Sequence, residues 1–188
     1  MMLWSILFMA YIRDLDSVKE YFSKSGVQAC DVLDDWWVDT VEGLSRTGNV
    51  MHLAVMREPF LTMLVRGDKT VESRFSMKRM APYGRCRQGD LVLIKGSGSG
   101  ISYYFTVSWS QSFVLKPGVI DVLERDFGHQ IGGDRDFWVE RVTKRYATLI
   151  GVDQVLECPY TELSKRDRRP WIDFGIASKA DFAVAKLF

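Results

Sequence analysis

Short apolar stretches separated by glycine-rich turns, from Val50 onward, constrain the fold of this chain more than any other feature. Stretches rich in Val, Ile, Tyr, Phe and Thr fit a pleated sheet surface, and glycine permits the turns between them. We expect strands at 51–56, 70–75, 91–95, 101–109 and 146–156, and helices at 60–66, 120–127 and 137–145. The sequence therefore predicts an α+β fold, a small, mostly antiparallel β-barrel with helices around it.

The first fifty residues have a different character, with apolar side chains at helical spacing. They carry four basic and eight acidic groups, a net charge of −4, whereas the remaining residues carry 21 basic and 16 acidic groups, a net charge of +5. The change of sign coincides with the polar tract 45–49. We therefore predict a helical appendage at 1–49 and a main domain at 50–188. The acidic, Trp-containing segment 31–42 suggests a protein partner for this appendage.

Composition limits the chemistry that the chain can perform. With 188 residues and 47% apolar content, it can build one good core. Cys30, Cys86 and Cys158 are scattered without a C-x-x-C pair, which argues against a zinc cluster and for a reducing compartment. His52 and His129 are the two histidines, too few for most histidine metal sites. We expect neither a metal nor a cofactor.

Residues 1–12 are apolar but show no basic start and are too short to span a bilayer. We interpret them as part of a packed helix or as residues added by an upstream start codon. We expect a cytoplasmic protein that does not use a membrane.

The stretch Leu64–Arg74, LVRGDKTVESR, gathers three charged side chains at a helix-to-strand connection. Gly67 suits the left-handed position that ends a helix, and alternate residues of the following extended segment share a face. Lys69 therefore lies beside Glu72 and Arg74, which suggests a small polar site. The alternative is a solvated turn with one surface ion pair, worth about 0 to 1 kcal/mol.

A second basic stretch, 164–171, reads SKRDRRPW. Arginine forks such as those of Arg168 and Arg169 bind phosphate oxygens, and Trp171, which we expect in a loop, can stack on an unpaired base. This combination is typical of single-stranded RNA recognition. A solvated charge run that joins the last strands is the alternative.

Two further residues are candidates for nucleic-acid contact. Lys95 stands at a strand end, just before the Gly/Ser hairpin 96–100, and Tyr83 lies in a predicted loop. Strand ends of a barrel present polar groups to a cleft, and a loop tyrosine is free to stack. For Lys95, an ordinary exposed lysine at the end of a strand is the favoured alternative.

Three motifs in order resemble those of the ASCH domain family, within the PUA-like superfamily: G-x-K-T-V-E-x-R at Gly67–Arg74, G-D-L-V-L at Gly89–Leu93, and Y-A-T-L-I at Tyr146–Ile150. The resemblance covers about residues 51–172. It implies a small, mostly antiparallel β-barrel with a cleft, lined by the first motif, that binds RNA or a nucleoside.

Characterised relatives include a bacterial amidohydrolase acting on N4-acetylcytidine and a bacterial ribonuclease, in which the motif lysine is essential; it matches Lys69. The resemblance therefore implies either an RNA or nucleoside binder or a hydrolase of such substrates. The amidohydrolase has Thr where this chain has Glu72, and its catalytic Glu lies in a later segment. Glu124 is a loose positional candidate for that residue.

Chemistry gives Lys69 a role in either case. Burial beside Arg74 would lower its pKa and release a basic amine, whereas Glu72 would raise the pKa. A neutral Lys69 could act as a general base, with Arg74 stabilising negative charge. A charged Lys69 would instead bind phosphate or a base carbonyl.

Overall fold

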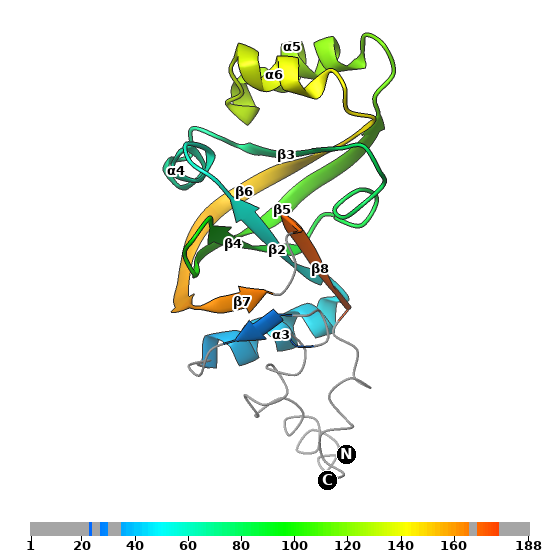
Figure 1. Cartoon of the computed structure of the whole chain (residues 1–188). Helices are drawn as coiled ribbons and strands as arrows, with labels where there is room; N and C mark the ends of the chain where they lie inside the picture. The colour runs from blue at the N-terminus through cyan, green and yellow to red at the C-terminus, as the bar shows by residue number, and fades with distance from the viewer. Residues whose placement is uncertain (1–22, 24–26, 30–34, 166–168, 177–188) are drawn as a thin grey trace.

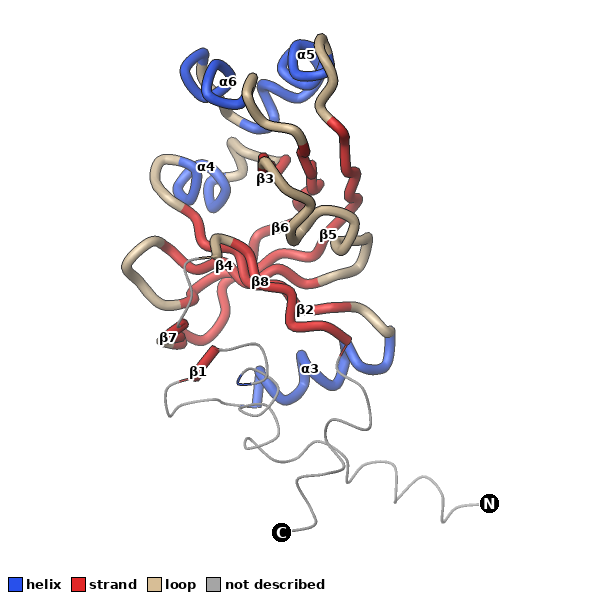
Figure 2. The backbone as a smooth tube through the Cα atoms, turned by 45° about the vertical axis from the view of Figure 1, so that its right-hand side comes forward, coloured by secondary structure: helices blue, strands red, loops and turns tan. Residues whose placement is uncertain are grey.

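Six strands form one curled sheet in the order β3-β6-β5-β4-β2-β8, and two short strands pair beside it (Figures 1 and 2). The computed structural model describes residues 23, 27–29, 35–165 and 169–176. The strands are β1 (Val27–Ala29), β2 (Val50–Met56), β3 (Val71–Ser76), β4 (Leu91–Gly96), β5 (Ile101–Val114), β6 (Tyr146–Thr161), β7 (Leu163–Lys165) and β8 (Trp171–Ile176). The helices are α3 (Asp35–Thr47), α4 (Phe60–Arg66), α5 (Val119–Ile131) and α6 (Arg135–Arg141).

Neighbouring strands of the large sheet run antiparallel, except that β2 and β4 pair in parallel. A parallel pair needs a long crossover connection. Residues 57–90 supply it here, and they contain α4, β3 and a loop. The crossover therefore carries the motif lysine to the far edge of the sheet, where β3 pairs with β6.

The crossover folds as its local sequence predicts. Pro59 precedes α4, and Gly67 ends it with φ of 80°, where its N–H donates to the carbonyl of Leu64. Only glycine adopts this left-handed conformation without strain. The chain then turns into β3 within the next four residues, as expected from the sequence.

Helix α3 lies at one end of the sheet, and α5 and α6 lie at the other (Figure 1). Trp37, Val41 and Leu44 of α3 pack on one end of the sheet, and Leu123 and Trp138 of α5 and α6 pack at the other. The apolar face of α3 is therefore covered by the sheet. The division of the chain at residue 49 stays a prediction.

Several elements differ in length from the prediction. Strands β5 and β6 extend to residues 114 and 161, and α5 to 131. The last expected helix begins at Arg135 and ends at Arg141, not at 145. Asp134 caps it by accepting from the N–H of Phe137, and the N–H of Arg145 donates to the carbonyl of Ser76 in β3. This sheet-like contact ends the helical stretch.

The predicted fold class, α+β with a small, mostly antiparallel barrel-like sheet and surrounding helices, is confirmed. None of the described helices combines the length and the apolar character needed to span a bilayer.

Candidate functional site

Backbone hydrogen bonds hold the turn 67–74 against two helices. The N–H of Lys69 donates to the carbonyl of Met63 in α4 at 3.1 Å. The N–H of Thr70 donates to the carbonyl of Gln130 in α5 at 2.9 Å. These two backbone hydrogen bonds therefore fix the turn against α4 and α5 without any side-chain contact.

Lys69, Glu72 and Arg74, here called the signature cluster, converge as the sequence predicts. The Lys69 side chain is 1% exposed, and its Nζ donates to the carbonyls of Val71 at 2.8 Å and Ile131 at 2.9 Å. Oε2 of Glu72 lies 3.4 Å away. Ile131 is the last residue of α5, where the helix dipole favours a cation. Three oxygen atoms thus surround the three hydrogen atoms of the ammonium group.

Arg74 lies on the other side of Glu72. Its Nε and Oε1 of Glu72 form an ion pair at 2.7 Å, although the buried Nε–H has no hydrogen-bond partner within the described part of the chain. Its terminal nitrogens donate to the carbonyls of Val55 at 3.2 Å and Pro170 at 3.3 Å, and its guanidinium lies 5.1 Å from the ring of Trp171. Glu72 is therefore shared between two cations.

Trp171 connects the signature cluster to a buried histidine. Its Nε1 can only donate, so Nδ1 of His52, at 3.3 Å, accepts and the imidazole proton lies on Nε2. That nitrogen donates to Oδ2 of Asp90 at 3.2 Å. Burial would raise the pKa of Asp90, but hydrogen bonds from His52 and from the N–H groups of Val50 and Arg87 together lower it.

His52, Asp90 and Cys86 bring three possible metal-ligand atoms within 4.8 Å of one another. Both nitrogens of His52 are already engaged, one by Trp171 and one by Asp90. Burial and the nearby carboxylate of Asp90 raise the pKa of the Cys86 thiol to about 12, so it is protonated at neutral pH. This donor set fits a structural hydrogen-bond network better than a metal centre.

Burial lowers the pKa of Lys69, and the neighbouring Glu72 opposes this effect. Arg74 and Arg141 lower the pKa further. The direction that the sequence left open is thus downward, although the three oxygen neighbours of Nζ still favour the charged form.

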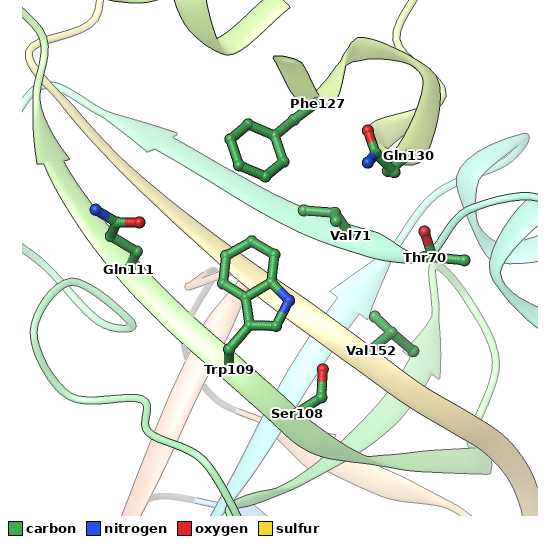
Figure 3. Close-up of a pocket in the computed structure, with 8 residues that line it drawn as sticks. All are labelled: Thr70, Val71, Ser108, Trp109, Gln111, Phe127, Gln130 and Val152. Carbon is green, nitrogen blue, oxygen red and sulfur yellow. The ribbon is translucent and has the colours of Figure 1, made fainter.

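A pocket of about 480 Å³ opens beside the turn 67–74, between β5 and α5 (Figure 3). We call it the Trp109 pocket. The ring of Phe127, on α5, lies opposite the ring of Trp109, on β5, with centroids 5.7 Å apart, and the amides of Gln111 and Gln130 lie to either side of the two rings. Its lining comprises Thr70, Val71, Ser108, Trp109, Gln111, Phe127, Gln130 and Val152. None of these side chains carries a charge.

A second hollow of about 280 Å³ shares Thr70 and Val152 with the Trp109 pocket, and Lys69 borders it. Glu72 and Arg74 line neither space. The signature cluster therefore lies next to open space but is itself closed.

Tyr83 and Lys95 occupy the kinds of position that the sequence predicts. Tyr83 lies in the loop between β3 and β4, half-buried, with its ring 5.2 Å from that of Tyr146. Lys95 is near the end of β4, and its Nζ donates to the carbonyl of Ser99 in the hairpin. A nucleic-acid contact by either residue stays a prediction.

The second basic stretch is only partly described. Arg168 lies outside the described residues, and Arg169 is exposed. The prediction that Trp171 lies in a loop is wrong, because it begins β8 and is 2% exposed. Pairing of β8 with β2, distant in sequence, draws the indole into the core.

The residues that line the open pocket are missed by the sequence analysis. Trp109 and Gln111 alternate along β5, a signal for one shared face, but the predicted strand ends at Trp109. Gln130 lies beyond the predicted end of its helix. A longer strand and helix would have brought all three together.

No protein-family model matches the chain, and no curated protein does. Among solved structures, it is similar to ASCH from Zymomonas mobilis, at 10% identity over 72% of this chain and 94% of that chain, with a TM-score of 0.48. A mutant of that protein is 11% identical over 73% of this chain and 96% of that chain, with a TM-score of 0.48. The N-terminal domain of Staphylothermus marinus McrB is 9% identical over 59% of this chain and 75% of that chain, with a TM-score of 0.36. The family that the three motifs resemble thus also occurs among the solved structures similar to this chain.

Proposed function

We propose that this chain binds RNA or a modified nucleoside, with a base held against Trp109 in the Trp109 pocket. The observation that carries this proposal is an open pocket with an aromatic wall and amide side chains at its rim (Figure 3). Its volume of about 480 Å³ is within the common range for small-molecule sites.

The lining suits a nucleobase better than it suits a phosphate. A base stacks on an indole ring whatever its identity, and amide groups both donate to and accept from the edge of a base. Gln111 and Gln130 each offer such an amide. An uncharged lining gives little attraction for phosphate, which must then be held elsewhere.

The signature cluster supports the pocket by positioning its wall. The ammonium of Lys69 joins the carbonyl of Val71 in β3 to that of Ile131 in α5. Val71 lines the pocket, and Gln130 adjoins Ile131. Lys69 is therefore a positioning residue in this proposal.

The binding test is a titration of labelled single-stranded RNA of about 12 nucleotides, and of cytidine and N4-acetylcytidine. We expect Trp109→Ala to weaken binding roughly five- to 150-fold, the equivalent of losing one base stack. Trp109→Phe should retain most of the affinity. The matched control is Tyr160→Ala, which removes a 60% exposed aromatic ring at the far end of β6. Unchanged binding by Trp109→Ala would refute the pocket.

A hydrolase of RNA or of an acylated nucleoside is the second candidate, favoured by burial that lowers the pKa of Lys69. A neutral amine could take a proton from water or from a ribose hydroxyl. The rate of such an enzyme should rise with pH as Lys69 loses its proton. Absence of product at high protein concentration, across RNA and acylated nucleosides, would exclude this candidate.

A further inference from the structure

The ends of β3 and β5 lie beside the start of β6 (Figure 1), because Ser76 of β3 and Val114 of β5 both pair with Tyr146 of β6. The chain segments next to these residues bring basic side chains to one place. Five of them make up what we call the basic edge: Lys78, Arg79, Lys116, Lys144 and Arg145.

The backbone of the basic edge is held by hydrogen bonds. The N–H of Arg145 donates to the carbonyl of Ser76 at 3.0 Å, and its carbonyl accepts from the N–H of Leu115 at 2.8 Å. The guanidinium of Arg79 lies 5.7 Å from the ring of Tyr83 and 5.4 Å from that of Tyr146. The backbone at Arg145 is therefore fixed between the ends of β3 and β5.

The charge of the basic edge is not neutralised by the described part of the protein. None of its five side chains forms an ion pair with a described carboxylate, whereas Arg46, Arg85, Arg87, Arg125 and Arg141 each do. The segments 73–89, 101–120 and 141–152 contain no Asp or Glu. Unpaired cations on adjoining strand ends repel one another, and an anionic partner would relieve that repulsion.

The basic edge and the Trp109 pocket belong to the same strand. Gln111 at the pocket and Val114 at the edge are three residues apart along β5, about 10 Å at the usual rise per residue. A polymer with regularly spaced negative charges and exposed bases can reach both. A duplex keeps its bases stacked inside, so the partner must have an unpaired strand.

We infer that the basic edge holds the phosphate backbone of single-stranded RNA while one of its bases enters the Trp109 pocket. This inference rests on the proposed function and narrows it, because a free nucleoside would use the pocket alone. The partner is thus a polynucleotide, bound through phosphates at the strand ends and through a base at Trp109.

The test compares the double variant Lys116→Gln/Arg145→Gln with the control double Arg57→Gln/Arg135→Gln. Both remove two exposed positive charges, and the control residues lie outside the basic edge and the pocket. Affinity for labelled RNA of about 12 nucleotides and for cytidine is measured at several salt concentrations. Thermal unfolding of each variant verifies that the fold survives.

We expect the double variant Lys116→Gln/Arg145→Gln, the edge variant, to bind RNA several-fold more weakly than the unmodified protein. The slope of log affinity against log salt should become shallower by about 1.4, which is 0.7 for each lost phosphate contact. The control should retain the slope, and cytidine binding should be equal in all proteins. An unchanged slope in the edge variant, with intact RNA and cytidine binding, would overturn the inference and leave the proposed function standing. Failure of the unmodified protein to bind RNA or nucleosides would overturn both.

The edge variant is also assayed on vesicles containing phosphatidylserine. Loss of vesicle binding, together with unchanged RNA binding, would assign the basic edge to an anionic membrane surface and overturn the RNA assignment.

Discussion

The signature cluster and the Trp109 pocket adjoin at the turn 67–74, which supplies Thr70 and Val71 to the pocket, yet they are built in opposite ways. In the cluster, Lys69 and Glu72 are buried, and each lies beside an oppositely charged or polar partner. In the pocket, uncharged side chains border open space. The contrast shows that charged residues conspicuous in a sequence can be closed off by their partners, while aromatic residues such as Trp109 can border open space.

The largest effect on stability is expected at Lys69, and it tests whether the signature cluster is a structural unit. Lys69→Met should cost about 3 to 5 kcal/mol of unfolding free energy, because it leaves the Glu72 carboxylate buried with one cation fewer. Urea unfolding measures this. The double variant Lys69→Met/Glu72→Gln should recover part of the loss. A cost below about 1 kcal/mol, the range of a surface pair, would show that the cluster is not a structural unit.

The next largest expected effect on the unfolding free energy is that of Asp90→Asn, and it depends on pH. Its pKa in the folded protein lies below the ordinary value of 3.8, so its ionised form stabilises the fold above that pH. This stability is lost as the pH falls through the folded value. Asp90→Asn should cost about 1 to 3 kcal/mol at neutral pH, and the difference from the unmodified protein should shrink below pH 3.8.

Unfolding curves at several pH values measure this difference, and exposed Asp39→Asn is the matched control. A pH-independent difference between Asp90→Asn and the unmodified protein would contradict the assignment.

Two glycines provide a matched pair of smaller effects. A Cβ atom at Gly67 or at Gly43 would meet nothing within 4 Å, so only the backbone distinguishes them. Gly67→Ala, at φ of 80°, should destabilise the protein by about 1 to 2 kcal/mol. Gly43→Ala, inside α3, should stabilise it by about 0.5 to 1 kcal/mol. Thermal unfolding of both variants measures the sign, and equal signs would refute the turn geometry that places Lys69.

The smallest effect on stability belongs to the open pocket. Gln111→Ala, at an exposed position, should change stability by no more than about 0.5 kcal/mol. It should weaken binding of the preferred nucleoside or RNA by about 1 kcal/mol, roughly fivefold, through the loss of one hydrogen bond. Gln88→Ala, also exposed, is the control for both measurements. A large stability loss at Gln111 would erase the difference between the two regions.

The sequence allowed the crossover to be predicted well, because its signals are local. Gly67 ends α4, and alternation places Glu72 and Arg74 on one face of β3. The convergence of the three charges followed from spacing within six residues. The burial of these charges among hydrogen-bond acceptors could not be predicted, because the acceptors include the carbonyls of Ile131 in α5 and of Pro170, far away in the chain.

The errors occur where pairing between distant segments decides the structure. The Ser- and Gln-containing end of β5, residues 110–114, has weak strand signals, but it pairs fully with β6. Trp171 looked like a loop residue beside arginines, but it pairs with Ala54 of β2, more than a hundred residues earlier. The Trp109 pocket depends on Gln111 of β5 and Gln130 of α5, which both lie beyond the predicted ends of their elements, so it could not be predicted from the sequence.

The contact between Arg74 and Pro170 ties the signature cluster to the timing of protein synthesis. A ribosome must add 96 residues after Arg74 before this acceptor exists, which takes about 5 to 20 seconds. Throughout that interval the nascent chain holds a guanidinium without its later carbonyl and without the indole of Trp171. The Arg74 side of the signature cluster is therefore complete only after Pro170 and Trp171 have been added, so a product that ends before them would leave this guanidinium without two of its contacts.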